Sequence, residues 1–95
     1  MRTLPFDKNK LEEIAKDYPT PFHIYDARAI RENARRLKKA FAWNKGFREY
    51  FAVKATPNPY IMKLLKDEFG FGSDCSSLPE LVLAEKVGNV GDRIM

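Results

Sequence analysis

The sequence predicts an α/β fold built on a parallel sheet. Apolar segments of strand length alternate with segments whose apolar residues recur at helical spacing, and capping residues stand between them. The order of strand, helix, strand, helix and strand start is βαβ repetition, which implies parallel strands joined by right-handed crossovers. Eight such units in about 250 residues close a (β/α)8 or TIM barrel. A chain of 95 residues therefore has room for the first two or three.

The composition is that of a folded domain. Hydrophobic residues make up 44% and charged residues 32%, which excludes low-complexity and largely disordered classes. The apolar runs are far shorter than the ~20 residues of a membrane-spanning helix, and the first residues show no secretory signal pattern. We therefore expect a cytoplasmic protein that does not enter a membrane. Cys75 is the only cysteine, so an internal disulfide is excluded and no metal site is expected.

The first elements are a helix and a strand. Apolar residues recur at helical spacing over residues 11–18, and Pro19 and Pro21 end the helix. Residues 22–25 (FHIY) are aromatic or β-branched and alternate, which predicts a short strand.

A long amphipathic helix is predicted from the N-cap Asp26 to about residue 41. The chain has a formal charge of +4, and much of its positive charge lies on one face of this helix, at Arg28, Arg31, Arg35, Arg36, Lys38 and Lys39. The simplest interpretation is a solvated face opposite an apolar one. Nucleic-acid binding is the alternative, but the interleaved aromatic residues typical of such surfaces are missing.

The second half repeats strand and helix. Residues 50–53 (YFAV) form a continuous apolar run, which predicts a strand buried on both faces. Asn58 and Pro59 begin a helix that Gly70 ends. Residues 71–75 then predict a second strand of weaker propensity.

The last helix and strand complete the alternation. Ser77 and Glu80 match a capping box, in which each side chain bonds a free backbone amide at the start of a helix. Gly88 ends that helix, and residues 93–95 are expected to open a third strand. The sheet is thus expected to be unfinished at residue 95.

Lys54 is the first candidate for chemistry, because it ends an apolar strand on the side where barrels place catalytic groups. Burial there would lower the pKa of its amine and make it available for Schiff-base chemistry. The alternative is a lysine that keeps the strand end soluble. Asp74 stands at the corresponding end of the next strand, where it could hold a cation or cap the following helix. Cys75 and His23 receive no role.

Three segments in order resemble the N-terminal part of diaminopimelate decarboxylases. They are residues 20–26 (TPFHIYD), residues 50–55 (YFAVKA) and residues 74–77 (DCSS) followed by Glu80. These decarboxylases belong to the alanine-racemase-like, fold-type III enzymes that use pyridoxal phosphate, with the ornithine and arginine decarboxylases. Thr56 and Pro79 depart from the residues that many relatives carry at those positions.

The resemblance implies that residues 1–95 are one N-terminal fragment of a pyridoxal phosphate-binding TIM barrel. Residues 1–25 would be a lead-in helix and strand, the strand at 22–25 being lent to the family's β-rich domain, and residues 26–95 would start the barrel. In such enzymes the lysine of the first barrel strand forms the Schiff base with the cofactor, which implies a catalytic and cofactor-binding role for Lys54. Asp74 is implied to lie near the cofactor.

The implied activity is decarboxylation of meso-diaminopimelate to lysine by a homodimeric full-length enzyme, with the fragment alone inactive. Alternatives within the family are an ornithine or arginine decarboxylase and a non-catalytic carrier of pyridoxal phosphate. From another class, the alternative is a basic module that binds nucleic acid or protein through the 28–39 face.

Overall fold

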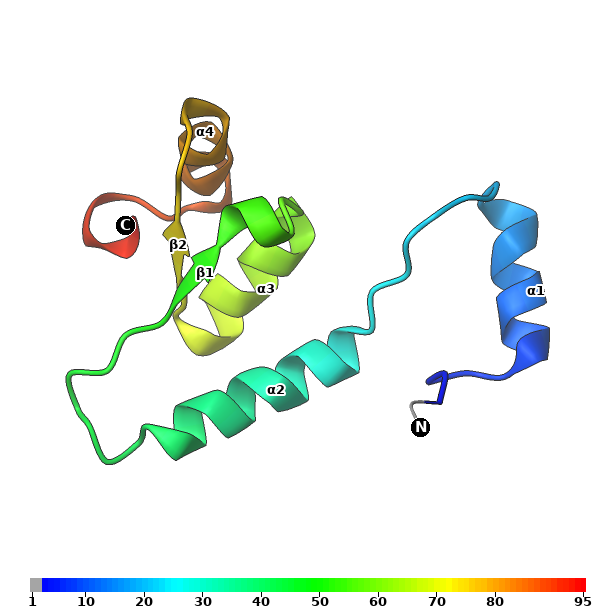
Figure 1. Cartoon of the computed structure of the whole chain (residues 1–95), viewed down its shortest axis with the longest axis horizontal. Helices are drawn as coiled ribbons and strands as arrows, with labels where there is room; N and C mark the ends of the chain where they lie inside the picture. Colours follow the sequence, from blue (N-terminus) through cyan, green and yellow to red (C-terminus); the bar gives the residue numbers. More distant parts are fainter. Residues whose placement is uncertain (1–2) are drawn as a thin grey trace.

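The computed structural model describes residues 3–95 and confirms the alternation of strands and helices (Figure 1). Two helices, α1 (Lys8–Asp17) and α2 (Ala27–Ala40), precede the first strand. Strand β1 (Tyr50–Ala52), helix α3 (Pro59–Phe69), strand β2 (Gly72–Asp74) and helix α4 (Leu78–Val87) follow, with short 3-10 turns at Val53–Ala55 and Gly91–Arg93.

The two strands are parallel neighbours. Their register pairs Tyr50 with Gly72, Phe51 with Ser73 and Ala52 with Asp74. Beyond β2 the predicted third strand begins, because Ile94 forms a parallel bridge with Ser73 and the Met95 amide donates to the Ser73 carbonyl at 2.9 Å. The chain therefore supplies two complete strands and the first contacts of a third.

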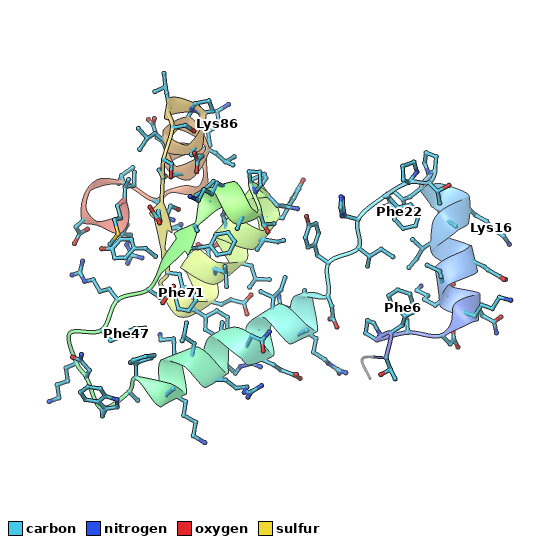
Figure 2. All side chains as sticks on the ribbon, in the orientation of Figure 1. Phe6, Lys16, Phe22, Phe47, Phe71 and Lys86 are labelled. Carbon is cyan, nitrogen blue, oxygen red and sulfur yellow. The ribbon has the colours of Figure 1, made fainter. Side chains whose placement is uncertain are left out.

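The apolar core lies where the helices meet the sheet. One cluster joins α2, α3 and the residue before β2 through Ala34, Ile61, Leu65 and Phe71. Figure 2 shows the Phe71 side chain near the end of β2 that faces α2 and α3. A second cluster joins the end of β1, α3 and α4 through Val53, Met62, Ala84 and Val87. Phe51 packs against both clusters and so connects them.

Most of the predicted helix ends are confirmed. The Asp26 carboxylate accepts from the amides of Arg28 and Ala29, and Asn58 caps α3 in the same way. Gly70 takes the left-handed φ of 72° that was expected at the end of α3. The predicted capping box is wrong in its contacts. Ser77 is the N-cap residue of α4, but its hydroxyl donates to the Glu80 carboxylate at 2.5 Å instead of accepting from a backbone amide.

Part of the basic face of α2 is used to hold α2 against α3. Arg31 forms an ion pair with Glu68, with 2.9 Å between Nε and Oε1. Lys38 Nζ donates to the Phe69 carbonyl at 3.1 Å, at the carboxyl end of α3. Two of the six cations on this face therefore have a structural role.

The predicted strand at residues 22–25 is wrong for this chain. The segment has no strand assignment, because within residues 3–95 no second strand lies beside it to complete a hydrogen-bonded ladder. Helix α1 has no buried residue and stands apart from α2–α4 (Figure 1). Phe6 and Phe22 lie beside α1 (Figure 2). The division of the chain near residue 25 remains a prediction.

The prediction that β1 is buried on both faces is also wrong. All three residues of β1 are only half-buried. Helices cover the face that carries Phe51, whereas on the opposite face the Tyr50 hydroxyl contacts the turn Gly91–Arg93 through the Asp92 carbonyl and Ala52 stays half-buried. Across residues 3–95 there is also no helix whose length and apolar character would suit a membrane span.

Replacing Met62 tests the second core cluster. Its side chain is 2% exposed, so we expect Met62→Ala to lower the free energy of unfolding by about 2–5 kcal/mol through the cavity it leaves. Urea denaturation followed by circular dichroism measures the change. Tyr60→Ala, in the same helix at a side chain 83% exposed, is the control and should change stability by about 0.5 kcal/mol or less. Equal effects at both positions would contradict the packing described.

Gly72 tests the contact between β2 and the third strand. A Cβ at this position would lie 2.5 Å from the Arg93 carbonyl oxygen and 2.7 Å from Cδ1 of Tyr50, closer than real Cβ atoms approach. We expect Gly72→Ala to destabilise the chain by about 1–3 kcal/mol in the same urea assay. Gly46→Ala is the matched control, because its Cβ would meet only Asn44 Oδ1, at 3.5 Å. A Gly72→Ala chain as stable as the control would disprove the close approach.

Candidate functional site

Lys54 lies immediately beyond the carboxyl end of β1. It is the middle residue of the 3-10 turn Val53–Ala55, and the fully buried Val53 before it anchors that turn in the second core cluster. The Lys54 side chain is exposed. Within residues 3–95 its amine takes part in none of the side-chain hydrogen bonds or ion pairs. The fold therefore presents a free primary amine at this end of the sheet.

Asp74 ends β2 at the same edge. The register pairs it with Ala52, two residues before Lys54, and strand residues advance by about 3.3 Å each. Because side chains alternate along a strand, Asp74 shares with Ala52 the face opposite Phe51. The alternative role of Asp74 as a helix cap is wrong, because Ser77 holds the N-cap position of α4.

The predicted burial of Lys54 is wrong for the described residues. Its side chain is exposed and β1 is only half-buried, so the solvent-free surroundings expected at the end of a buried strand are missing.

Behind Asp74 lie Cys75 and Glu80, on the side of α4. The Cys75 thiol contacts the Glu80 carbonyl at 3.5 Å. Burial raises the pKa of this thiol, and the carboxylates of Glu80 and Asp74 raise it further. A raised pKa favours the protonated thiol over the nucleophilic thiolate. The Glu80 carboxylate, which sequence reasoning assigned to capping, instead lies against Ser77.

A cavity of about 270 Å³ lies at the opposite, amino end of the strands. Its lining groups are mostly bonded to one another. Arg48 forms an ion pair with Asp92 at 3.0 Å, and the Tyr50 hydroxyl donates to the Asp92 carbonyl at 2.6 Å. The hydrogen bond from Arg48 lowers the pKa of the Asp92 carboxyl. Sequence reasoning missed this cavity, because its walls come from three separate segments of the chain.

Neither His23 nor a metal cluster contributes to the carboxyl edge. His23 is exposed in the unpaired segment before α2 and stacks on Tyr25, with 6.4 Å between ring centroids. Over residues 3–95, no three side chains among His, Cys, Asp and Glu gather closely enough to hold a metal ion.

The residue types at the carboxyl edge are compatible with a carbonyl-bearing cofactor. An uncommitted lysine amine can form a Schiff base, and a carboxylate on the same edge can accept a hydrogen bond or balance a cationic ring. The structure therefore places the two predicted site residues, Lys54 and Asp74, at the carboxyl ends of two neighbouring parallel strands.

Known proteins resemble this chain along most of its length. Protein TabA of Pseudomonas amygdali pv. tabaci is 55% identical over 85 residues, covering 90% of this chain and 20% of TabA. Diaminopimelate decarboxylase of Methanothermobacter thermautotrophicus is 39% identical over 84 residues, covering 87% of this chain and 19% of that enzyme. The chain thus spans about a fifth of the length of these curated relatives.

The fold also matches a solved structure. The crystal structure of lysine decarboxylase from Selenomonas ruminantium superposes with a TM-score of 0.85 at 24% identity, over 100% of this chain and 25% of that one. The match confirms the predicted fold class, an opening portion of a (β/α)8 barrel. The sequence model of the family described as "Pyridoxal-dependent decarboxylase, pyridoxal binding domain" matches residues 27–95, from the start of α2 to the end of the chain. The chain therefore belongs to the pyridoxal-dependent decarboxylase family, of whose pyridoxal binding domain it carries the first part.

Proposed function

We propose that Lys54 is the residue that binds pyridoxal phosphate, in a protein that decarboxylates an amino acid. The observation that carries the proposal is the exposed amine of Lys54 at the carboxyl end of β1, next to the strand that Asp74 ends. Membership of the pyridoxal-dependent decarboxylase family supports it. Barrels place their catalytic groups at this end of the strands, which supports the choice of Lys54 over the chain's other lysines.

Each residue of the edge has a definite task in this proposal. Lys54 would hold the cofactor through its amine, which has to be in its neutral form to bond to an aldehyde carbon. Asp74 provides a carboxylate that accepts a hydrogen bond or balances positive charge near that amine. When bound, the cofactor supplies the conjugated ring that takes up the electron pair left as the carboxylate departs as carbon dioxide. Val53 holds the Lys54 turn in place through its burial in the core.

We further propose meso-diaminopimelate as the substrate of the whole protein and lysine as its product. Several relatives named diaminopimelate decarboxylase support this choice, at 39% identity for those from Methanothermobacter thermautotrophicus and Aquifex aeolicus. A cytoplasmic homodimer is part of the same proposal. Ornithine or arginine decarboxylation and cofactor carriage without catalysis are the competing outcomes of the substrate test.

Borohydride trapping tests the role of Lys54. The chain is incubated with pyridoxal phosphate and reduced, and mass spectrometry then locates the phosphopyridoxyl group. We expect labelling to concentrate on Lys54 and to disappear in Lys54→Arg, which keeps the positive charge but cannot form the bond. Lys45→Arg is the matched control, because Lys45 is also an exposed lysine outside the helices and strands. Labelling spread evenly over the lysines at low cofactor concentration would rule out a selective site.

A segment exchange tests the activity. The matching segment of Methanothermobacter thermautotrophicus diaminopimelate decarboxylase is replaced by this chain, and carbon dioxide release from meso-diaminopimelate is measured. We expect the exchanged enzyme to remain active, and Lys54→Ala within it to lower kcat by at least about 10²–10⁴-fold, because the covalent anchor is lost. Ornithine, arginine and lysine serve as competing substrates. An exchanged enzyme that retains its cofactor but prefers one of these would contradict the proposed substrate.

A further inference from the structure

Ser73 and Asn89 form a buried polar pair behind the candidate site. Each residue is 1% exposed, and Asn89 Nδ2 donates to Ser73 Oγ at 2.7 Å. Every other side-chain to side-chain hydrogen bond shown for residues 3–95 lies at an exposed position. This pair is therefore an exception within an otherwise apolar interior.

The pair joins the middle of β2 to the turn that follows α4. Ser73 lies opposite Phe51 in the register and directly precedes Asp74, and its carbonyl accepts from the Met95 amide. Asn89 follows Gly88, whose left-handed φ of 96° ends α4, and the Asn89 amide donates to the Ala84 carbonyl at 2.9 Å. The side chain of Asn89 is thus held by a helix end that is itself fixed.

Stability alone does not explain the pair. Asn89 Oδ1 is buried and has no hydrogen-bond partner among residues 3–95, and an unpaired buried acceptor is unfavourable. Replacing two buried polar partners by apolar groups of similar shape is commonly neutral or stabilising. A directional bond between two buried groups can instead select one arrangement of the elements that it joins.

At the carboxyl end of β2, no apolar side chain fixes which way the strand faces, so another interaction has to do so. Phe71 anchors the amino end in the first core cluster, but Gly72 has no side chain and Ser73 carries no apolar group for the core. A shift of one residue would turn every side chain of β2 to the opposite face. Asp74 would then point toward the helices and away from the edge that carries Lys54.

We propose that Ser73 and Asn89 are positioning residues, whose hydrogen bond fixes β2 so that Asp74 faces the Lys54 side of the sheet. The importance of this orientation for the cofactor rests on the proposed function. The geometric effect does not, because it concerns only the placement of β2 against β1 and α4.

The test compares Ser73→Ala and the apolar pair Ser73→Ala/Asn89→Leu with the unmodified chain. Nuclear magnetic resonance of labelled chains reports the Asp74 amide signals and the cross-strand contact between Ala52 and Asp74. Urea denaturation reports stability, and borohydride trapping reports labelling of Lys54. Ser76→Ala is the matched control, because it removes the same hydroxyl from an exposed position three residues further on.

We expect the apolar pair to remain as stable as the unmodified chain but to lose the single Ala52–Asp74 contact, with a second set of Asp74 signals and reduced labelling of Lys54. Ser73→Ala should show the same loss, and it decides the question alone if the double variant does not fold. One unchanged set of Asp74 signals in Ser73→Ala would overturn the inference, whatever the labelling shows. Failure of the unmodified chain to label at Lys54 would instead count against the proposed function and leave the resonance result standing.

Discussion

The position of Phe51 is the constraint on which the rest of this structure depends. Its side chain contacts both core clusters, so one residue of β1 holds the packing of α2, α3 and α4 to a single face of the sheet. Alternation along the strand then places Tyr50 and Ala52 on the opposite face. The parallel register carries Asp74 to that face with Ala52. The edge on which the proposed chemistry depends is thus set by packing on the other side of the sheet.

How far the sequence predicts this fold depends on the range of each interaction. Asp26, Asn58 and Gly70 act on backbone groups a few residues away, so local patterns predict their roles correctly. A strand at residues 22–25 needs a distant partner, and local propensity cannot supply one. The burial of Lys54 fails as a prediction for the same reason, since an apolar strand indicates a buried environment without indicating which elements create it.

The same distinction between local and distant interactions applies to the residues of the candidate site. Lys54 and Asp74 are found from their places at the ends of predicted strands, because strand direction alone brings carboxyl ends together in a parallel sheet. The Ser73–Asn89 pair lies outside what the sequence predicts. Asn89 follows a helix-ending glycine and looks like an ordinary turn residue, and its burial depends on contacts that span 16 residues. The buried hydrogen bond between Ser73 and Asn89 is evident only in the folded structure, where the turn after α4 lies against β2.

The charged groups at the two ends of the sheet differ in whether they pair with other groups of the described chain. At the amino end, Arg48 is paired with Asp92, and Arg93 Nη1 donates to the Gly70 carbonyl at 3.4 Å, so these charges link separate segments of the chain. At the carboxyl end, Lys54 and Asp74 form none of the ion pairs found in residues 3–95. Groups already bound to one another contribute stability, whereas an uncommitted amine and carboxylate are free to bind a ligand. This difference between the two ends matches the division of barrels into a stabilising end and a reactive end, and it favours the carboxyl edge over the cavity at the amino end as the ligand site.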